Sequence, residues 1–157
     1  REYRATILGQ PLWVAFFTYV KSALVRQMFA TLKIGYSVSD YSARFEFSAM
    51  PANGGYIKPH TDIASKVVTI VLPMVRDGEW QVEWGGGTNI LRPKDATKAL
   101  ESYKAGLSEF DVVRTFEFQP NRAVVFIKTD NSWHSVGPIQ GPEGKFRRSL
   151  TINIEKV

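Results

Sequence analysis

The sequence predicts a mainly β protein with flanking helices, in which the strands form a sandwich or barrel with a jelly-roll-like winding. Two observations lead to this fold class. Only the first quarter of the chain has the features of a helix, and from about residue 42 onward short alternating apolar runs are separated by turn residues. Six or more short strands at this spacing are typical of jelly rolls and antiparallel barrels.

A long helix is predicted to begin at Pro11, in the segment PLWVAFFTYVKSALVRQMFATLK. Proline suits the first helical turn because its missing N–H would have no partner there. Apolar side chains recur at spacings of three and four residues, at Trp13, Phe16, Phe17, Val20, Leu24 and Met28. We expect this stripe to be a packing face rather than a binding site.

Six strands are predicted from alternating apolar runs, at residues 43–50, 66–73, 79–84, 114–118, 122–128 and 148–154. The intervening breaks contain the Gly, Pro, Asn and Asp residues that turns require. A short helix is expected within residues 93–106. We therefore expect a single domain over residues 1–157, with helical support from 1–42 and a β core from 43–157.

Composition excludes several classes of function. The chain of 157 residues contains no cysteine, which removes disulfides, zinc fingers, iron–sulfur clusters and thiol nucleophiles. The net charge is +5, but the basic residues are dispersed, so we expect no nucleic-acid partner. No run approaches the about 20 apolar residues of a membrane span, and no signal peptide is visible. We therefore expect a cytoplasmic protein with no membrane association, and the sequence leaves its oligomeric state open.

The two histidines of the chain lie where predicted strands meet turns. In GGYIKPHTDIASK, His60 and Asp62 are two residues apart, so an extended strand projects both from one face. His134, in TDNSWHSVGPI, follows the predicted strand 122–128 and a polar turn. Two imidazoles and one carboxylate form the facial triad that suits Fe(II) oxygenases. Alternatively, His60 and Asp62 form a surface pair and His134 fills a niche in the core.

The last predicted strand has two distinct faces. Leu150, Ile152 and Ile154 lie on one, and a polar row of Arg147, Ser149, Thr151 and Asn153 lies on the other. If the apolar face packs against the N-terminal helix, the polar row lines the interior of the barrel. A buried arginine needs an anion, and its planar fork matches a carboxylate, with Ser149 or Thr151 adding a hydroxyl donor. Alternatively, residues 145–148 form a solvated basic turn.

Taken together, H-T-D, a distant histidine and R-R-S-L-T resemble the 2-oxoglutarate- and Fe(II)-dependent oxygenases, which share a double-stranded β-helix fold. The resemblance runs from about Phe45 to the C-terminus. GGYIKPHTD resembles the first metal strand, as in prolyl hydroxylases, and EFQPNRAVVFIKTDNSWHSVGPI resembles the strand pair that carries the distal histidine. RRSLTINI resembles the final strand, whose first arginine binds the co-substrate. The family often has Gly-Gly followed closely by an apolar strand, and here the run is WGGGTNIL. Gly85, Gly86 and Gly87 would serve that turn, in a register that the sequence leaves open.

The resemblance implies that the catalytic metal ligands are His60, Asp62 and His134, and that the cofactors are Fe(II), 2-oxoglutarate and O₂. Arg147 would hold the distal carboxylate of 2-oxoglutarate, with Ser149 and Thr151 beside it. Tyr56, four residues before His60 on the same strand face, is a candidate for the co-substrate pocket, with a structural aromatic as the alternative. The resemblance implies hydroxylation of an unidentified substrate with release of succinate and CO₂. Related halogenases lack the carboxylate ligand, which Asp62 provides here.

Two rival functions use part of the same evidence. The three ligands plus water could hold Zn²⁺ in a hydrolase or isomerase of cupin-like (jelly-roll) architecture, which leaves Arg147 without a purpose. A non-catalytic jelly-roll module could instead bind glycan or protein through Trp80 and Trp84. These aromatics alternate with Val82, however, and we expect them to face a core.

Overall fold

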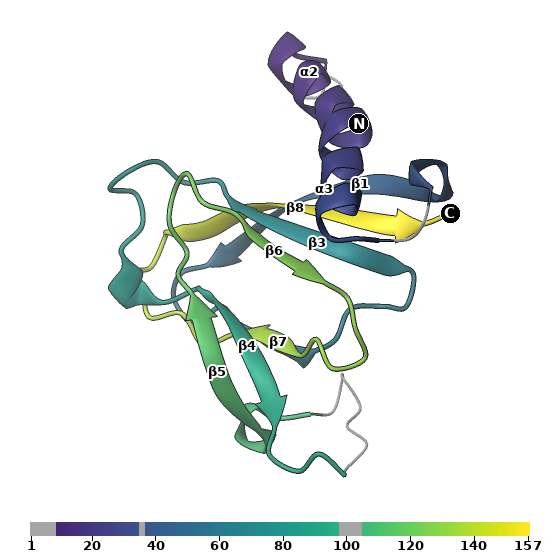
Figure 1. Ribbon diagram of the computed structural model, residues 1–157. Coiled ribbons are helices and arrows are strands. Elements are labelled where there is room, and N and C mark those ends of the chain that lie inside the picture. Colours follow the sequence, from purple (N-terminus) through teal and green to yellow (C-terminus); the bar gives the residue numbers. More distant parts are fainter. Residues whose placement is uncertain (1–8, 35–36, 98–104) are drawn as a thin grey trace.

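The computed structural model describes residues 9–34, 37–97 and 105–157 (Figure 1). The chain enters through a helical segment of three parts: α2 (Pro11–Tyr19), the π-helical turn η1 (Val20–Leu24) and α3 (Val25–Thr31). Short 3₁₀ helices follow at η2 (Val38–Asp40), η3 (Val82–Trp84) and η4 (Leu107–Glu109). The strands are β1 (Tyr41–Pro51), β2 (Ile57–His60), β3 (Lys66–Pro73), β4 (Thr88–Pro93), β5 (Phe110–Phe116), β6 (Val124–Ile127), β7 (His134–Val136) and β8 (Phe146–Lys156).

These strands form two four-stranded antiparallel sheets, ordered β1-β8-β3-β6 and β2-β7-β4-β5. Within the described chain, only β4 and β5 are neighbours both in sequence and in a sheet. Every other pairing joins strands that are distant in sequence, so the chain crosses repeatedly from one sheet to the other. This winding is the double-stranded β-helix, and it confirms the predicted jelly-roll fold class.

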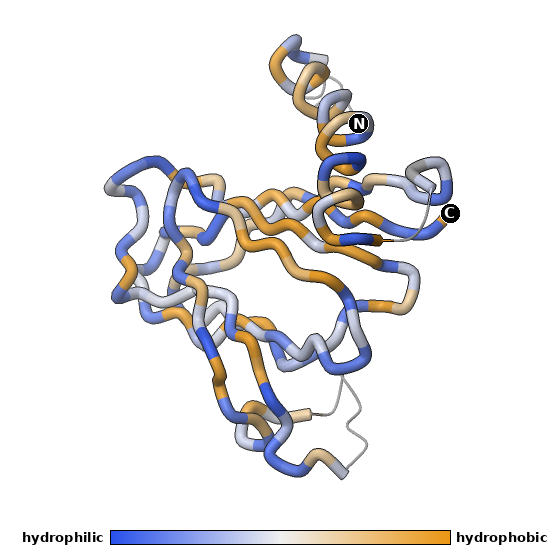
Figure 2. The backbone as a smooth tube through the Cα atoms, viewed as in Figure 1, coloured by the Kyte–Doolittle hydropathy of each residue, from blue (hydrophilic) through white to orange (hydrophobic). Residues whose placement is uncertain are grey.

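The N-terminal helical segment packs on the outer face of the first sheet, with α3 at the strands and the start of α2 projecting away from them (Figure 1). Val20, Val25 and Phe29 join Leu150, Ile152 and Ile154 in one buried cluster, to which β3 adds Val68 and Ile70. Figure 2 shows the same apolar lining along the helix and the strands that it faces. The apolar face of the last strand therefore packs against the helix, as expected, and the polar row of β8 faces the second sheet.

The predicted helical stripe is confirmed with one change. Trp13, Phe16, Leu24 and Met28 pack against the core, and the rings of Phe17 and Phe45 lie 4.3 Å apart. In α3, however, the fully buried side chains are Val25 and Phe29, one position beyond the predicted Leu24 and Met28. The π-helical turn between α2 and α3 explains the shift, because its wider turn accommodates one extra residue and rotates the following stripe.

Most predicted strands are present with altered ends. Strand 66–73 coincides with β3, while 43–50 and 148–154 lie within the longer β1 and β8. Strand 122–128 contains the shorter β6, and 114–118 overlaps only the end of β5. The short strands β2, β4 and β7 were not among the six apolar runs, because three to six residues are too few to show a clear alternation.

The prediction of a strand at 79–84 was wrong. That segment is irregular and ends in η3. The indole N–H of Trp80 donates to the carbonyl of Gly85 over 3.0 Å, which folds the segment back on itself. Trp80 is buried against Trp84 and Phe118, as expected for a core aromatic, so its periodic spacing reflects packing rather than an extended strand.

Three further predictions concern the short helix within residues 93–106, the domain division and membrane association. Residues 94–97 and 105–106 are not helical, and residues 98–104 of the proposed helix lie outside the described residues. The domain division at residue 42 stays a prediction. No helix in the described ranges is both long and apolar enough to cross a membrane.

Candidate metal centre

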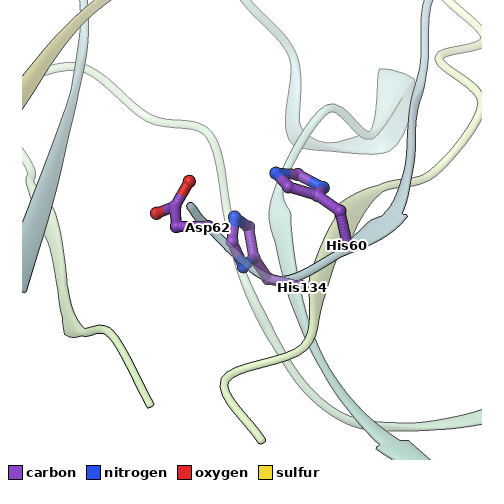
Figure 3. A group of neighbouring side chains, drawn as sticks. All are labelled: His60, Asp62 and His134. Atoms are coloured by element: carbon purple, nitrogen blue, oxygen red, sulfur yellow. The ribbon is translucent and has the colours of Figure 1, made fainter. Parts of the chain in front are cut away.

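His60, Asp62 and His134 come together at the paired ends of β2 and β7 (Figure 3). The two strands are antiparallel with His60 directly opposite His134, and the imidazole centroids are 4.2 Å apart. Asp62 follows two residues after the end of β2. One potential ligand atom from each side chain lies within 4.8 Å of the other two. These are the only described residues that form such a group, and the alternative of a surface pair plus a separate core histidine does not describe this geometry.

Both histidines are oriented by the backbone in the same way. His60 Nδ1 lies 2.9 Å from the carbonyl oxygen of Lys58, and His134 Nδ1 lies 2.9 Å from that of Ser132. A carbonyl oxygen can only accept, so each Nδ1 carries the proton. The neutral ring then has its free lone pair on Nε2. This arrangement, in which one ring nitrogen is fixed by a carbonyl and the other is left for a metal, is typical of metal-binding histidines.

Asp62 is buried and bonded through both carboxylate oxygens. Lys66 Nζ donates to Oδ1 over 2.7 Å, and the hydroxyl of Thr69 donates to Oδ2 over 2.7 Å. Burial alone would raise the pKa of Asp62, but the hydrogen bonds from Lys66 and Thr69 outweigh it and leave the pKa below its ordinary value. Asp62 is thus an anion at neutral pH.

The second histidine is held neutral. Burial, followed by the neighbouring His60, lowers the pKa of His134. Phe126 of β6 packs against its imidazole with a centroid distance of 4.5 Å and provides an apolar wall. A neutral imidazole is the form that binds a metal, so at neutral pH His134 provides a neutral nitrogen donor beside the anionic oxygen donor of Asp62.

Arg147 of β8 lies between the two sheets and is only 3% exposed. Its Nε donates to the carbonyl of Gly86 over 2.7 Å, and its guanidinium stacks on Phe118 at 4.3 Å from the ring centroid. No carboxylate of the described residues forms an ion pair with it, and burial lowers the pKa of Arg147 to about 10. A buried cation without an anionic partner is costly, and a ligand carboxylate would supply the missing charge.

The loop before β4 is shaped to admit this arginine. Gly86 has a backbone φ of +80°, and a Cβ at that position would lie 3.0 Å from Trp80 and 3.3 Å from Cδ of Arg147. Only glycine therefore allows the carbonyl of residue 86 to approach the guanidinium. Gly86, in the Gly-Gly-Gly run whose register the sequence left open, therefore provides the carbonyl that Arg147 contacts.

The other predicted site residues are placed differently. Ser149 lies beside Arg147, with its hydroxyl 3.4 Å from Nη1, and it is also hydrogen-bonded to Ser48. Thr151 shares that face of β8 and is partly buried. Tyr56, just before β2, is 55% exposed and does not belong to the buried cluster, so its role in co-substrate binding stays a prediction.

Sequence reasoning missed several residues that support the site. Lys66 and Thr69 bind Asp62, while Gly86 and Phe118 hold Arg147. The strand pattern of 66–73 could have placed Thr69 on the interior face, but nothing local in the sequence connects Phe118 or Gly86 with Arg147. Those contacts join segments that are 29 and 61 residues apart and exist only through the crossing strands.

The residues fit a ferrous ion and a dicarboxylate. Two imidazole nitrogens whose tautomer is fixed by carbonyls, together with one ionised carboxylate, are the donor set of non-haem Fe(II) oxygenases. The guanidinium of Arg147, which has no carboxylate partner in the described ranges, provides a separate anchor for a carboxylate on the same interior. Zn²⁺ could use the same three ligands, but it would give Arg147 no partner.

Comparison with known proteins gives the same family. The sequence model of the 2OG-Fe(II) oxygenase superfamily matches residues 45–155. No curated protein sequence matches the chain significantly. A prolyl-4-hydroxylase from Pseudomonas putida has a similar structure, with 22% identity, a TM-score of 0.55, and coverage of 85% of this chain and 62% of that chain. A prolyl 4-hydroxylase from Phytophthora capsici is 19% identical, with a TM-score of 0.53 and coverage of 94% of this chain and 43% of that chain.

At these identities the two enzymes share the fold with this chain, which spans less than two thirds of the length of either. The family match is independent of that likeness and includes all four residues of the metal and arginine sites. It extends over more than half of the sequence and over every strand from the middle of β1 to β8. The chain therefore belongs to the 2-oxoglutarate- and Fe(II)-dependent oxygenase superfamily, whose cofactors are Fe(II), 2-oxoglutarate and O₂.

Proposed function

We propose that this chain is a dioxygenase that hydroxylates an organic substrate and converts 2-oxoglutarate into succinate and CO₂. His60, Asp62 and His134 hold Fe(II), and Arg147 binds the distal carboxylate of 2-oxoglutarate. The observation that carries the proposal is the pairing of the three ligand atoms, all within 4.8 Å of one another, with a buried guanidinium that has no carboxylate partner among the described residues.

Each residue has a defined part in this chemistry. When bound, Fe(II) supplies the reaction of O₂ that is coupled to oxidative decarboxylation of 2-oxoglutarate. The backbone carbonyls of Lys58 and Ser132 keep both histidines in the tautomer that leaves Nε2 free. Asp62 adds the negative charge, and Thr69 fixes its orientation. His60, Asp62 and His134 would hold the ion through three protein ligands, which would leave it able to bind co-substrate and O₂ as well.

Arg147 orients the co-substrate. Its Nε is occupied by Gly86, which leaves the terminal nitrogens and the neighbouring hydroxyl of Ser149 for a carboxylate. Phe118 and Trp80 exclude water around the guanidinium, so a charge-assisted hydrogen bond is stronger there than at the surface. The anchored carboxylate then restricts the rest of the co-substrate to one orientation.

Metal content and co-substrate turnover test the proposal together. Purified protein loaded anaerobically with Fe(II) should bind about one iron per chain and form succinate when 2-oxoglutarate and O₂ are added. His60→Ala, Asp62→Ala and His134→Ala should each abolish stoichiometric iron and succinate formation. Asp130→Ala is the matched control, because this carboxylate lies on the exposed turn before β7 and should leave both unchanged.

Two outcomes would support the rival functions instead. Stoichiometric zinc without 2-oxoglutarate binding would indicate the cupin-like hydrolase or isomerase. No stoichiometric metal under any loading would indicate the binding module. The screen for the primary substrate should begin with proline-containing peptides, because the structurally similar proteins include prolyl hydroxylases.

A further inference from the structure

Lys66 is an unexpected residue at the metal centre. Its ammonium donates to Asp62 Oδ1 over 2.7 Å, and its side chain is only 15% exposed. Asp62 therefore already has a cation on the carboxylate that the proposed Fe(II) would use. Because a buried carboxylate needs a compensating charge, Lys66 provides it when no metal is bound.

The backbone of β3 places Lys66 there by a specific distortion. Lys66 pairs with Glu155 of β8, whereas Val68 pairs with Ile154, so β3 contains one extra residue at this point. Thr69 pairs with Asn153, which shares a face of β8 with Glu155. Regular alternation would put Lys66 and Thr69, three residues apart, on opposite faces. The bulge places both on the face of Asp62, and bulges commonly redirect a side chain in this way beside active sites.

A second carboxylate lies beside Lys66. Glu155 is its direct partner across the two strands, and such pairs have Cβ atoms about 5 Å apart. Arg44 already binds Glu155, with contacts of 2.6 and 3.1 Å. The hydrogen bond from Arg44 makes the largest contribution to lowering the pKa of Glu155, and the charge of Lys66 adds to the effect. The flexible four-carbon stem of lysine allows its ammonium to reach either carboxylate.

We propose that Lys66 is a positioning residue that holds Asp62 in place before metal loading and is displaced toward Glu155 when a divalent ion binds. This inference rests on the proposed metal site but not on the reaction. A divalent ion and an ammonium compete for one carboxylate, since like charges at such short separation repel. The protein thus keeps a buried anion stable without metal, at the expense of affinity for the metal.

Direct metal binding tests the competition. Co²⁺ alone, without 2-oxoglutarate, is titrated calorimetrically into wild-type protein and into Lys66→Met, which keeps the stem but removes the charge. We expect Lys66→Met to bind Co²⁺ about tenfold more tightly, equivalent to about 1.4 kcal/mol. Lys66→Arg should restore the wild-type affinity. Lys128→Met is the matched control, because its ammonium is equally buried (13% exposed) but bonds Asp130.

The role of Glu155 is tested by a double-mutant cycle. Glu155→Gln should weaken Co²⁺ binding in wild-type protein, and its effect should be smaller in the Lys66→Met background, where no ammonium needs a second partner. Equal effects of Glu155→Gln in the two backgrounds would overturn the proposed displacement toward Glu155.

A measurement on the wild-type protein covers the case in which Lys66→Met does not fold. The NMR signals of the Lys66 side chain, next to the ammonium, should shift when Zn²⁺ is added, whereas those of Lys128 should not. Unchanged Lys66 signals at saturating Zn²⁺ would overturn the proposal. So would equal or weaker Co²⁺ binding by folded Lys66→Met, or the absence of Co²⁺ binding by wild-type protein. If the competition is observed but no succinate forms with Fe(II), the proposed function fails and this inference stands.

Discussion

Two adjacent arginines at the start of β8 show how much a single position decides. Arg147 is enclosed between the sheets beside Gly86 and Phe118, whereas Arg148 is exposed and forms an ion pair of 2.6 Å with Glu79. The side chains of a strand alternate between faces, so the apolar Leu150, Ile152 and Ile154 already assign Arg148 to the outer face and Arg147 to the inner one. This choice was correct from the sequence.

Replacing these arginines should therefore have very different effects on co-substrate binding. Arg147→Ala removes a charge-assisted contact worth about 1.5–3 kcal/mol, so the KM for 2-oxoglutarate should rise by roughly 10- to 100-fold. Arg148→Ala should leave that KM within about twofold, because exposed ion pairs contribute little. Steady-state succinate formation at varied 2-oxoglutarate measures both. An unchanged KM in Arg147→Ala would show that another cation anchors the co-substrate.

A substitution at Gly86 tests whether this glycine positions the guanidinium of Arg147. Gly86→Ala introduces a Cβ 3.0 Å from Trp80 and 3.3 Å from Arg147, and should raise the KM for 2-oxoglutarate by displacing the guanidinium. Gly78→Ala is matched in backbone strain, because Gly78 has φ +77° but open space around it. Gly78→Ala should lower stability by about 1 kcal/mol without changing the KM. The same KM change in both variants would mean that backbone strain, not contact with Arg147, is responsible.

Among the elements, the N-terminal helix is bound to the outer face of the β1-β8-β3-β6 sheet, opposite the face that contributes to the site. Its side chains differ widely in exposure from one position to the next. Phe29 is 4% exposed and packs edge-on against Tyr41 at 4.7 Å, whereas Leu12 near the start of α2 is 77% exposed. The described part of the helix therefore stabilises β8 from behind, on the face opposite the candidate metal centre.

Truncation of these two side chains should separate packing from surface hydrophobicity. Phe29→Ala should lower the free energy of unfolding by about 3–5 kcal/mol through lost burial and a cavity. Leu12→Ala should change it by no more than about 0.5 kcal/mol. Urea unfolding of the metal-free protein measures both values. A small effect of Phe29→Ala would show that α3 does not pack on the sheet in solution.

Elements were predictable from sequence to the degree that they carry a regular pattern. The helix was identified because apolar residues recur along it at spacings of three and four, and β3 was identified because its apolar run is nearly continuous. The strand predicted at 79–84 failed because Trp80 and Trp84 alternate with Val82 for a different reason, the packing of indoles on Phe118 and on each other. The π-helical turn could not be predicted, because a one-residue widening leaves no distinct mark in composition.

At the scale of the whole molecule, the site makes stability dependent on pH. Burial and then His60 lower the pKa of His134 from its ordinary value of 6.5, and the hydrogen bonds of Asp62 outweigh its burial and lower its pKa from 3.8. In both cases the unfolded chain binds the proton at a higher pH than the folded chain. Acidification therefore favours unfolding, first below pH 6.5 through His134 and then below pH 3.8 through Asp62.

The loss of stability that His134 causes below pH 6.5 can be measured. In metal-free protein, the free energy of unfolding should fall by up to about 1.4 kcal/mol per pH unit as the pH drops from 6.5. His134→Gln, which cannot titrate, should show a shallower fall between pH 6.5 and 5. Urea unfolding at intervals of half a pH unit gives the two slopes. Parallel slopes would show that His134 titrates equally in the folded and unfolded chains.

The sequence by itself predicted the jelly-roll class of the β core, the helix that packs on it and the three residues that gather at the candidate metal centre. Alternation and local spacing indicated which face a side chain occupies, as in the polar and apolar faces of β8, whereas the meeting of His134 with His60 and Asp62 was expected from the resemblance to the oxygenase family. Only the tertiary structure decided what surrounds those residues. The contacts of Arg147 with Gly86 and Phe118 join segments far apart in sequence, and Lys66 reaches Asp62 through a bulge. A bulge depends on pairing with another strand, so no local pattern in β3 could specify it.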